Sequence, residues 1–176
     1  MANREALREL QNRLALRLQA ARTEGVQASW LAVESAGARY LFPLSQSGEI
    51  FPFSSAQPVP YTRAWFLGVA NLRGGLYGVV DLASFLGGGA PVQRAEGTRA
   101  EARLVVLNAM FEVNCALLID RLAGLRHLDA FSSSSEPPEG SPGYFGSGYT
   151  DAQGHYWQEI NLQALSQQPQ FLSISA

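Results

Sequence analysis

The sequence predicts a mainly β protein made of two copies of a small unit of about five strands, preceded by an N-terminal helix. Two observations carry this prediction. After Gly25, apolar and β-branched residues alternate with a period of two in short runs separated by Gly, Pro and Ser turn signals. The order of these runs then repeats, with a nearly constant offset of roughly 74–80 residues.

Length and composition limit the alternatives. The chain has 176 residues, of which 47% are hydrophobic, enough for a core in one domain or two very small ones. No apolar run approaches the length of a membrane span, so direct membrane insertion is not expected. A net charge of −2 gives no indication of a nucleic-acid surface. The single cysteine, Cys115, fits a reducing compartment and excludes a disulfide scaffold.

The first element is a helix over residues 3–24. Leu7, Leu10, Leu14 and Leu18 recur at steps of three and four, and Gly25 is a stop signal. We expect this leucine stripe to pack against the rest of the protein; the alternative is that it binds a partner helix. The predicted organisation is therefore a helix at 1–25, a first β subdomain with a linker at 26–100, and a second β subdomain at 101–176.

The first unit begins with a hairpin around Ser35-Ala36-Gly37 and continues with an edge strand that contains Pro52. A second hairpin turns at Arg73-Gly74-Gly75, and residues 87–100 have the composition of a linker or mobile loop. The predicted elements are strands at 30–34, 39–44, 49–53, 66–72 and 76–82 and a helical turn at 82–86.

The second unit repeats this order. A hairpin around Ala109-Met110 comes first, and the serine- and proline-rich residues 132–142 predict no regular element. The predicted elements are strands at 104–107, 113–119, 122–128, 144–149 and 155–160 and a short helix at 161–167.

Three matches relate the two units: residues 66–68 with 144–146, 81–82 with 161–162, and 41–44 with 115–118. Five short strands leave two unpaired edges, so we expect each unit to close into a small barrel. Side chains fill the interior of a barrel of this size. Function is therefore expected on outer surfaces, turns, or the seam between the units.

The residues show no credible catalytic, cofactor or metal site. Cys115 lies in an apolar strand, typical of an inert thiol, and His127 and His155 have no metal or nucleophile spacing. Asp81 and Asp120 each end an apolar strand, where a carboxylate usually caps the next turn. We therefore expect a protein that is not an enzyme and that needs no cofactor or metal.

The strongest candidate for binding is the turn Asn71-Leu72-Arg73-Gly74-Gly75. Glycines permit a tight reversal, and a guanidinium held on a rigid hairpin loses little entropy when it binds a carboxylate or carbonyl oxygens. Arg73 lies between apolar strands. An anchored arginine surrounded by uncharged surface is typical of the centre of a protein–protein interface. Glu49, at the start of the third strand, is a second candidate.

These residues resemble the CheW-like domain family, the coupling proteins of bacterial chemosensory arrays. Residues 66–74 followed by Val79-Val80-Asp81-Leu82 resemble the most characteristic run of the family. Leu41-Phe42-Pro43-Leu44 with Glu49-Ile50 resembles an early strand pair, and Leu117-Leu118-Ile119-Asp120 resembles a later strand. With its long N-terminal helix, the chain is similar to the PilI-type couplers of type IV pilus twitching motility.

The resemblance implies two SH3-like five-stranded β-barrel subdomains and an adaptor without enzymatic activity. Its expected partners are the cytoplasmic tip of a methyl-accepting chemoreceptor and the regulatory domain of a CheA-type histidine kinase, in the cytoplasm at receptor arrays of the inner membrane. Arg73 and Gly74 resemble the contact turn of the family, and Glu49 and Ile50 resemble its strand contact.

Two other functions are kept as alternatives. The first is a β module that binds a small molecule or peptide in a groove lined by aromatic residues of the last two strands, Tyr144, Phe145, Tyr149, Tyr156 and Trp157. The second is a hydrolase that uses Cys115, His127 or His155. Aromatic residues on strands are more often part of the core, so the adaptor is preferred.

Overall fold

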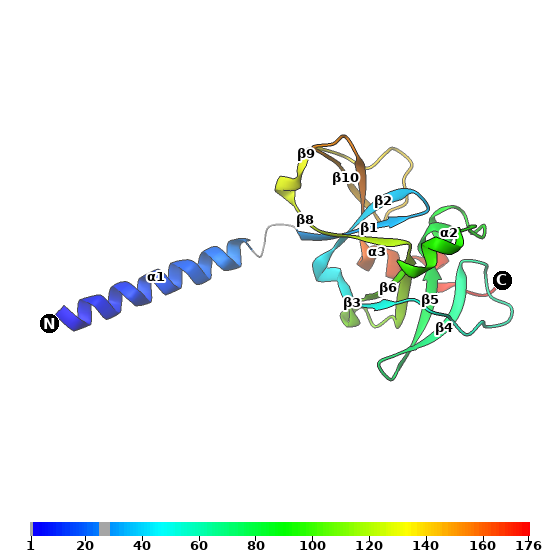
Figure 1. Ribbon diagram of the computed structural model, residues 1–176, viewed down its shortest axis with the longest axis horizontal. Helices are drawn as coiled ribbons and strands as arrows, with labels where there is room; N and C mark the ends of the chain where they lie inside the picture. Colours follow the sequence, from blue (N-terminus) through cyan, green and yellow to red (C-terminus); the bar gives the residue numbers. More distant parts are fainter. Residues whose placement is uncertain (1, 25–28) are drawn as a thin grey trace.

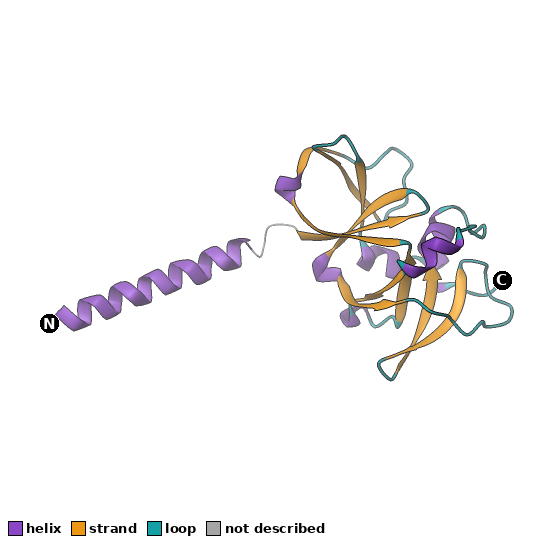
Figure 2. Cartoon of the chain, in the orientation of Figure 1, coloured by secondary structure: helices purple, strands orange, loops and turns teal. Residues whose placement is uncertain are grey.

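A computed structural model describes residues 2–24 and 29–176 of the chain, as one long helix followed by a body of two β-sheets (Figures 1 and 2). The long helix, α1, spans Ala2–Glu24, as predicted; Gly25, the predicted stop signal, lies outside the described residues. No helix within the described residues is long and apolar enough to cross a membrane.

The first sheet has six strands in the order β8-β1-β2-β11-β10-β9. Its strands are β1 (Ser29–Ser35), β2 (Ala38–Pro43), β8 (Arg121–His127), β9 (Phe131–Ser135), β10 (Phe145–Asp151) and β11 (Tyr156–Ile160). All neighbouring pairs are antiparallel except β2 and β11, which are parallel.

The second sheet has five strands in the order β3-β6-β7-β5-β4. Its strands are β3 (Ser47–Pro52), β4 (Phe66–Leu72), β5 (Gly75–Asp81), β6 (Arg103–Leu107) and β7 (Cys115–Ile119). Here β5 and β7 are the one parallel pair. As Pro52 predicts, β3 is an edge strand.

Short helices connect and cover these strands. They are the α-helices α2 (Leu82–Leu86), α3 (Leu162–Ser166) and α4 (Pro169–Leu172), and the 3₁₀ helices η1 (Leu44–Gln46), η2 (Glu96–Ala100), η3 (Ala109–Phe111) and η4 (Leu128–Ala130). Asp81 and Asn161 begin α2 and α3 in the same way, because each side chain accepts a hydrogen bond from the backbone N–H three residues later.

The sheets exchange strands between the two halves of the sequence. The hairpin β1–β2 joins β8 to β11 of the second half, while β6 and β7 join β3 to β5 of the first half. In both sheets the second strand of the hairpin pairs in parallel with the strand that precedes α2 or α3. Strands β2 and β7 thus occupy equivalent places, which supports the predicted repeat. The match of residues 41–44 with 115–118 is shifted by one residue, because Leu41 pairs with the residue two before the cap of α3, whereas the residue that pairs two before the cap of α2 is Ala116. The predicted boundary near residue 100 does not separate one sheet from the other.

The expected closure of each unit into a barrel is wrong, because neither sheet returns to its first strand by hydrogen bonding. The mainly β class is confirmed. Because strands are exchanged between the two halves, one sheet has six strands and the other has five, and two identical five-stranded barrels do not form.

Three hydrophobic cores explain why the inner strands are apolar on both faces. Residues of one face of each sheet form a shared core between the sheets, including Leu31, Val105 and Leu117. The alternate residues, such as Leu104 and Leu118 in β6 and β7, fill a second core on the other face of the five-stranded sheet. A third core, around Trp30 and Trp157, lies on the outer face of the six-stranded sheet.

Two loop predictions need correction. Residues 132–142 include the end of β9, an edge strand whose serines pair with β10 through the backbone, and the Ser132 hydroxyl donates to the Thr150 carbonyl at 3.2 Å. Serine is compatible with an exposed edge because the backbone supplies the hydrogen bonds there. The predicted linker 87–100 is tied to the body by Arg94, whose side chain is only 15% exposed and pairs with Asp81 and Asp120.

The expectation that the leucine stripe of α1 packs against the body is wrong. Leu7, Leu10 and Leu14 are each more than half exposed, and Figure 1 shows α1 extending away from the sheets. Leu18 lies outside the side chains that the structure describes.

Candidate functional site: the Arg73 turn and the adjoining pocket

The hairpin β4–β5 ends in a two-residue turn made by Arg73 and Gly74. Both have positive φ values, +52° and +82°, which is the geometry that matches the twist of the flanking strands. The Asn71 side chain reinforces the turn by accepting a hydrogen bond from the Gly74 N–H at 3.0 Å. The predicted turn is therefore confirmed but is one residue shorter, because Gly75 pairs with Leu72 in the strands.

Arg73 and Glu49 form an ion pair across the two ends of the five-stranded sheet. Arg73 Nη1 lies 3.0 Å from Glu49 Oε1, and the side chains are 77% and 54% exposed. Glu49 is on the edge strand β3, whereas Arg73 follows the opposite edge strand β4. This side-chain ion pair therefore links the two edge strands of the sheet, which are not joined by backbone hydrogen bonds.

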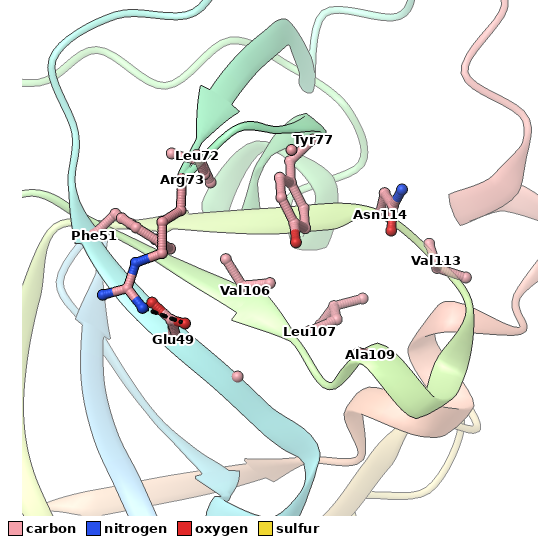
Figure 3. Close-up of a pocket in the computed structure, with 12 residues that line it drawn as sticks. Glu49, Phe51, Leu72, Arg73, Tyr77, Val106, Leu107, Ala109, Val113 and Asn114 are labelled. Carbon is pink, nitrogen blue, oxygen red and sulfur yellow. Dashed lines mark hydrogen bonds and ion pairs between the residues drawn. The ribbon is translucent and has the colours of Figure 1, made fainter.

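An open pocket of about 380 Å³ lies beside this ion pair (Figure 3). Among the described residues, Arg73 and Glu49 are the charged ones that line it. The other lining residues are apolar or uncharged: Gly48, Phe51, Leu72, Gly75, Tyr77, Val106, Leu107, Ala109, Val113 and Asn114. A charged rim on an uncharged hollow suits a partner that combines a polar group with an apolar side chain.

The structure brings together two of the four predicted contact residues. Ile50 is 40% exposed but is not among the residues that line the pocket. Gly74 faces open space, since a Cβ added there would meet no atom within 4 Å. Its contribution is the conformation of the turn.

Tyr77 is a pocket residue that the sequence reasoning missed. It lies two residues after Gly75, on the same face of β5, and a Cβ at Gly75 would come within 2.8 Å of the Tyr77 ring. Glycine therefore leaves room for the ring beside the turn. The signal was present in the Gly75-Leu76-Tyr77 spacing of the sequence.

The residues considered for catalysis have structural environments. The Cys115 thiol is buried, and desolvation raises its pKa to about 12, so it is a protonated thiol at neutral pH. His127 Nδ1 lies 3.1 Å from the Ser29 hydroxyl at the end of β8, and His155 pairs with Asp151 in the β10–β11 turn. These three residues lie on different elements.

Asp81 and Asp120 bind backbone and arginine groups. Asp81 caps α2, as predicted, and also forms a two-bond pair with Arg94, with contacts of 2.6 and 2.7 Å. Asp120 accepts from the Ala36 N–H at 2.7 Å and from Arg94 Nε. Among the described residues no group of three His, Cys, Asp or Glu side chains is arranged to hold a metal ion.

The aromatic residues proposed for a ligand groove are largely part of the cores. Tyr144 and Trp157 are 7% and 3% exposed, and the Tyr149 ring packs at a tilt against Trp30 with ring centroids 4.9 Å apart. Tyr156 is more exposed, but its hydroxyl donates to Gln158 at 2.9 Å. The observation that favoured a small-molecule module is thus explained by packing.

Comparisons with known proteins agree with this architecture. The model of the CheW-like domain matches residues 29–170. Protein PilI of Pseudomonas aeruginosa is 29% identical over 158 residues, which cover 88% of this chain and 85% of PilI. The crystal structure of the scaffolding protein TtCheW from Thermoanaerobacter tengcongensis superposes with a TM-score of 0.61 at 16% identity, covering 77% of this chain and 89% of TtCheW.

The match to the family model includes both sheets, the Arg73 turn and Glu49. The similarity to PilI extends over most of the chain and agrees with the subgroup that the sequence resembles. The chain therefore belongs to the CheW-like domain family.

Proposed function

We propose that this protein is a non-enzymatic adaptor that couples a chemoreceptor to a histidine kinase. Membership of the CheW-like family and similarity to PilI support a chemosensory adaptor role. The proposed partners are the cytoplasmic tip of a methyl-accepting chemoreceptor and the regulatory domain of a CheA-type kinase. The place of action is the cytoplasm, at receptor arrays that control type IV pilus twitching motility.

The observation that carries this proposal is the Arg73–Glu49 pair beside an uncharged pocket. The rigid turn holds the guanidinium with most of its surface free, and the carboxylate orients it without burying it. An arginine that is already positioned loses little entropy on binding. Such an adaptor transmits a signal when it binds two states of a receptor with different free energies, which requires no chemical step.

The test is binding of the full chain to a purified receptor-tip fragment and to a purified kinase regulatory domain, measured by titration calorimetry. Arg73→Ala is expected to weaken at least one complex by about 1 kcal/mol or more, as for an interface hot spot. Because Arg73 is exposed, the free energy of unfolding should change by less than about 0.5 kcal/mol.

Arg99→Ala is the matched control, since Arg99 is also an exposed arginine but lies in η2, away from the pocket. It should leave both affinities unchanged. If Arg73→Ala binds both fragments as tightly as the original chain, Arg73 is not in the contact site. If the original chain binds neither fragment, the adaptor proposal itself fails.

A further inference from the structure

Helix α1 presents an apolar stripe that nothing in the described structure covers. Every side chain described for it, over residues 5–16, is exposed. Leu7, Leu10 and Leu14 are 58%, 60% and 53% exposed, although they lie on one face of the helix. Helices in proteins owe most of their stability to packing of an amphipathic face, so a partner that covers the stripe would stabilise α1.

The charges of the segment are distributed unevenly around this stripe. With Leu7 and Leu14 at heptad position a and Leu10 at d, the bordering e and g positions between residues 4 and 20 include Arg4 and Arg13 and no acidic residue. Glu5 and Glu9 fall at f and c, away from the stripe. Over residues 2–24 the sequence has five arginines and three glutamates, a net charge of +2.

We propose that α1 is a docking helix for an amphipathic helix of a partner protein whose apolar stripe is bordered by acidic residues. Leucines from the two helices would pack in the seam, and carboxylates of the partner would face the arginines at e and g, the positions that select coiled-coil partners. This proposal does not depend on the Arg73 pocket, which lies on the body of the protein.

A second copy of the chain is a poorer occupant of the stripe. Position 17, the next d position, is an arginine, so a parallel, in-register pair of α1 helices would bring two arginines together in its seam. The +2 charge of each segment adds to this repulsion. Opposite charge favours a different, acidic helix.

A lipid surface is also a poorer occupant. Residues 2–24 include no Trp, Tyr or Phe, the aromatic residues that are found at membrane interfaces. Leu7, Leu10 and Leu14 form a narrow seam of a and d positions, with Leu18 at the adjacent e position. Helices that lie in a membrane have a broader apolar face. Leu16, the other exposed leucine, is at position c, beyond this seam.

The experiment uses the full chain and two designed three-heptad peptides, both with leucine at a and d. One peptide has glutamate at e and g, and its matched control has lysine. Binding of the labelled peptides is measured by fluorescence anisotropy. We expect the acidic peptide to bind, more weakly as salt is added, and the basic peptide not to bind.

Two pairs of substitutions separate the stripe from the rest of the helix. Leu10→Gln should weaken binding of the acidic peptide by about tenfold, because it removes a buried leucine, whereas Leu16→Gln should leave binding unchanged. Arg13→Glu should weaken it more than Arg8→Glu, since residue 8 is at position b. Circular dichroism of each variant checks that its helix content is unchanged.

Several outcomes would overturn the proposal. They are equal binding of the two peptides, equal effects of Leu10→Gln and Leu16→Gln, concentration-dependent dimerisation of the chain that Leu10→Gln abolishes, or Leu10-dependent binding to vesicles of anionic phospholipid. Arg73→Ala should bind the acidic peptide normally, so failure of this proposal and failure of the receptor–kinase proposal can be distinguished.

Discussion

Arg73 occupies a backbone conformation that glycine or asparagine adopts more readily. Its φ of +52° places a non-glycine residue in the left-handed region, which costs of order 1 kcal/mol or more. Its side chain is 77% exposed, so packing of that side chain does not offset this cost. Residues held in this way are concentrated at functional sites, which agrees with a contact role for Arg73.

Asp151 shows how a single carboxylate can stabilise a hairpin turn. Its side chain accepts hydrogen bonds from the Trp157 indole N–H at 3.0 Å and from the backbone N–H groups of Gln153 and His155 at 2.9 Å. The indole hydrogen bond is the largest contribution, and together with the backbone bonds it lowers the pKa of Asp151 from its usual 3.8 to about 2.

This lowered pKa predicts an acid-dependent loss of stability. Because the folded pKa is below the unfolded one, the contribution is fully present above about pH 4 and is lost as the pH falls toward 2. The urea midpoint of the original chain should therefore fall more steeply over this interval than that of Asp151→Asn. The exposed Asp129→Asn should follow the original profile, and equal slopes for Asp151→Asn would contradict the prediction.

At the scale of elements, Arg94 holds the loop between β5 and β6 against the body of the protein. Its guanidinium binds Asp81 through two hydrogen bonds and Asp120 through Nε, and these carboxylates raise its pKa. Asp120 also accepts from the Ala36 N–H in the β1–β2 turn. One arginine thus connects the loop, the five-stranded sheet and the hairpin of the other sheet.

Arg94→Ala is expected to lower the free energy of unfolding by about 3 kcal/mol, measured by urea denaturation. The reason is that the substitution leaves two carboxylates, 4% and 13% exposed, without their cation. Arg94→Lys should recover only part of the loss, because lysine lacks the planar fork. Arg99→Ala in the same loop should change stability by less than about 0.5 kcal/mol; a similar loss in that variant would argue against the Arg94 contacts as the cause.

At the scale of the whole molecule, the exchange of hairpins makes the two halves of the chain depend on each other. The β2–β11 and β5–β7 pairings both join the first half to the second. The shared core between the sheets also takes residues from both halves, such as Phe42 and Ile160. Neither half has its own complete sheet.

This arrangement predicts that residues 1–100 and residues 101–176 do not fold when expressed separately. Co-expressed, the two fragments should associate and give the dispersed amide spectrum of a folded protein. The measurement is nuclear magnetic resonance of each fragment and of the pair. Cooperative unfolding of the fragment 1–100 alone would contradict the exchange as the source of stability.

Much of the architecture could be predicted locally. The first hairpin turn, the edge position of Pro52 and the cap formed by Asp81 each depend on neighbouring residues, and the structure confirms them. The turn itself is made by residues 36–37, because Ser35 pairs with Ala38. The family resemblance was also carried by short runs such as residues 66–74. Arg73 and Glu49 were predicted as separate candidates, Arg73 from its place in a glycine-containing turn and Glu49 from the start of its strand.

Longer-range contacts could not be predicted in this way. The ion pairs of Arg94 with Asp81 and Asp120 connect separate segments of the chain, whereas residues 87–100 on their own have only the composition of a loop. β9 forms because β10 offers a free edge, which overrides the weak strand preference of four serines. The leucines of α1 have the same three- and four-residue spacing whether the helix face is exposed or buried, so the spacing alone could not predict that they are exposed.

The order of the short strands, the tight Arg73 turn and the alternation that builds cores on both faces of the sheets follow from the amino-acid sequence, because they arise from interactions among near neighbours. The exchange of hairpins, the meeting of Arg73 with Glu49 and the exposure of α1 were settled only by the tertiary structure. They depend on which strand edges and apolar faces find each other across the chain, and the free energies of such pairings are set by the complete set of partners.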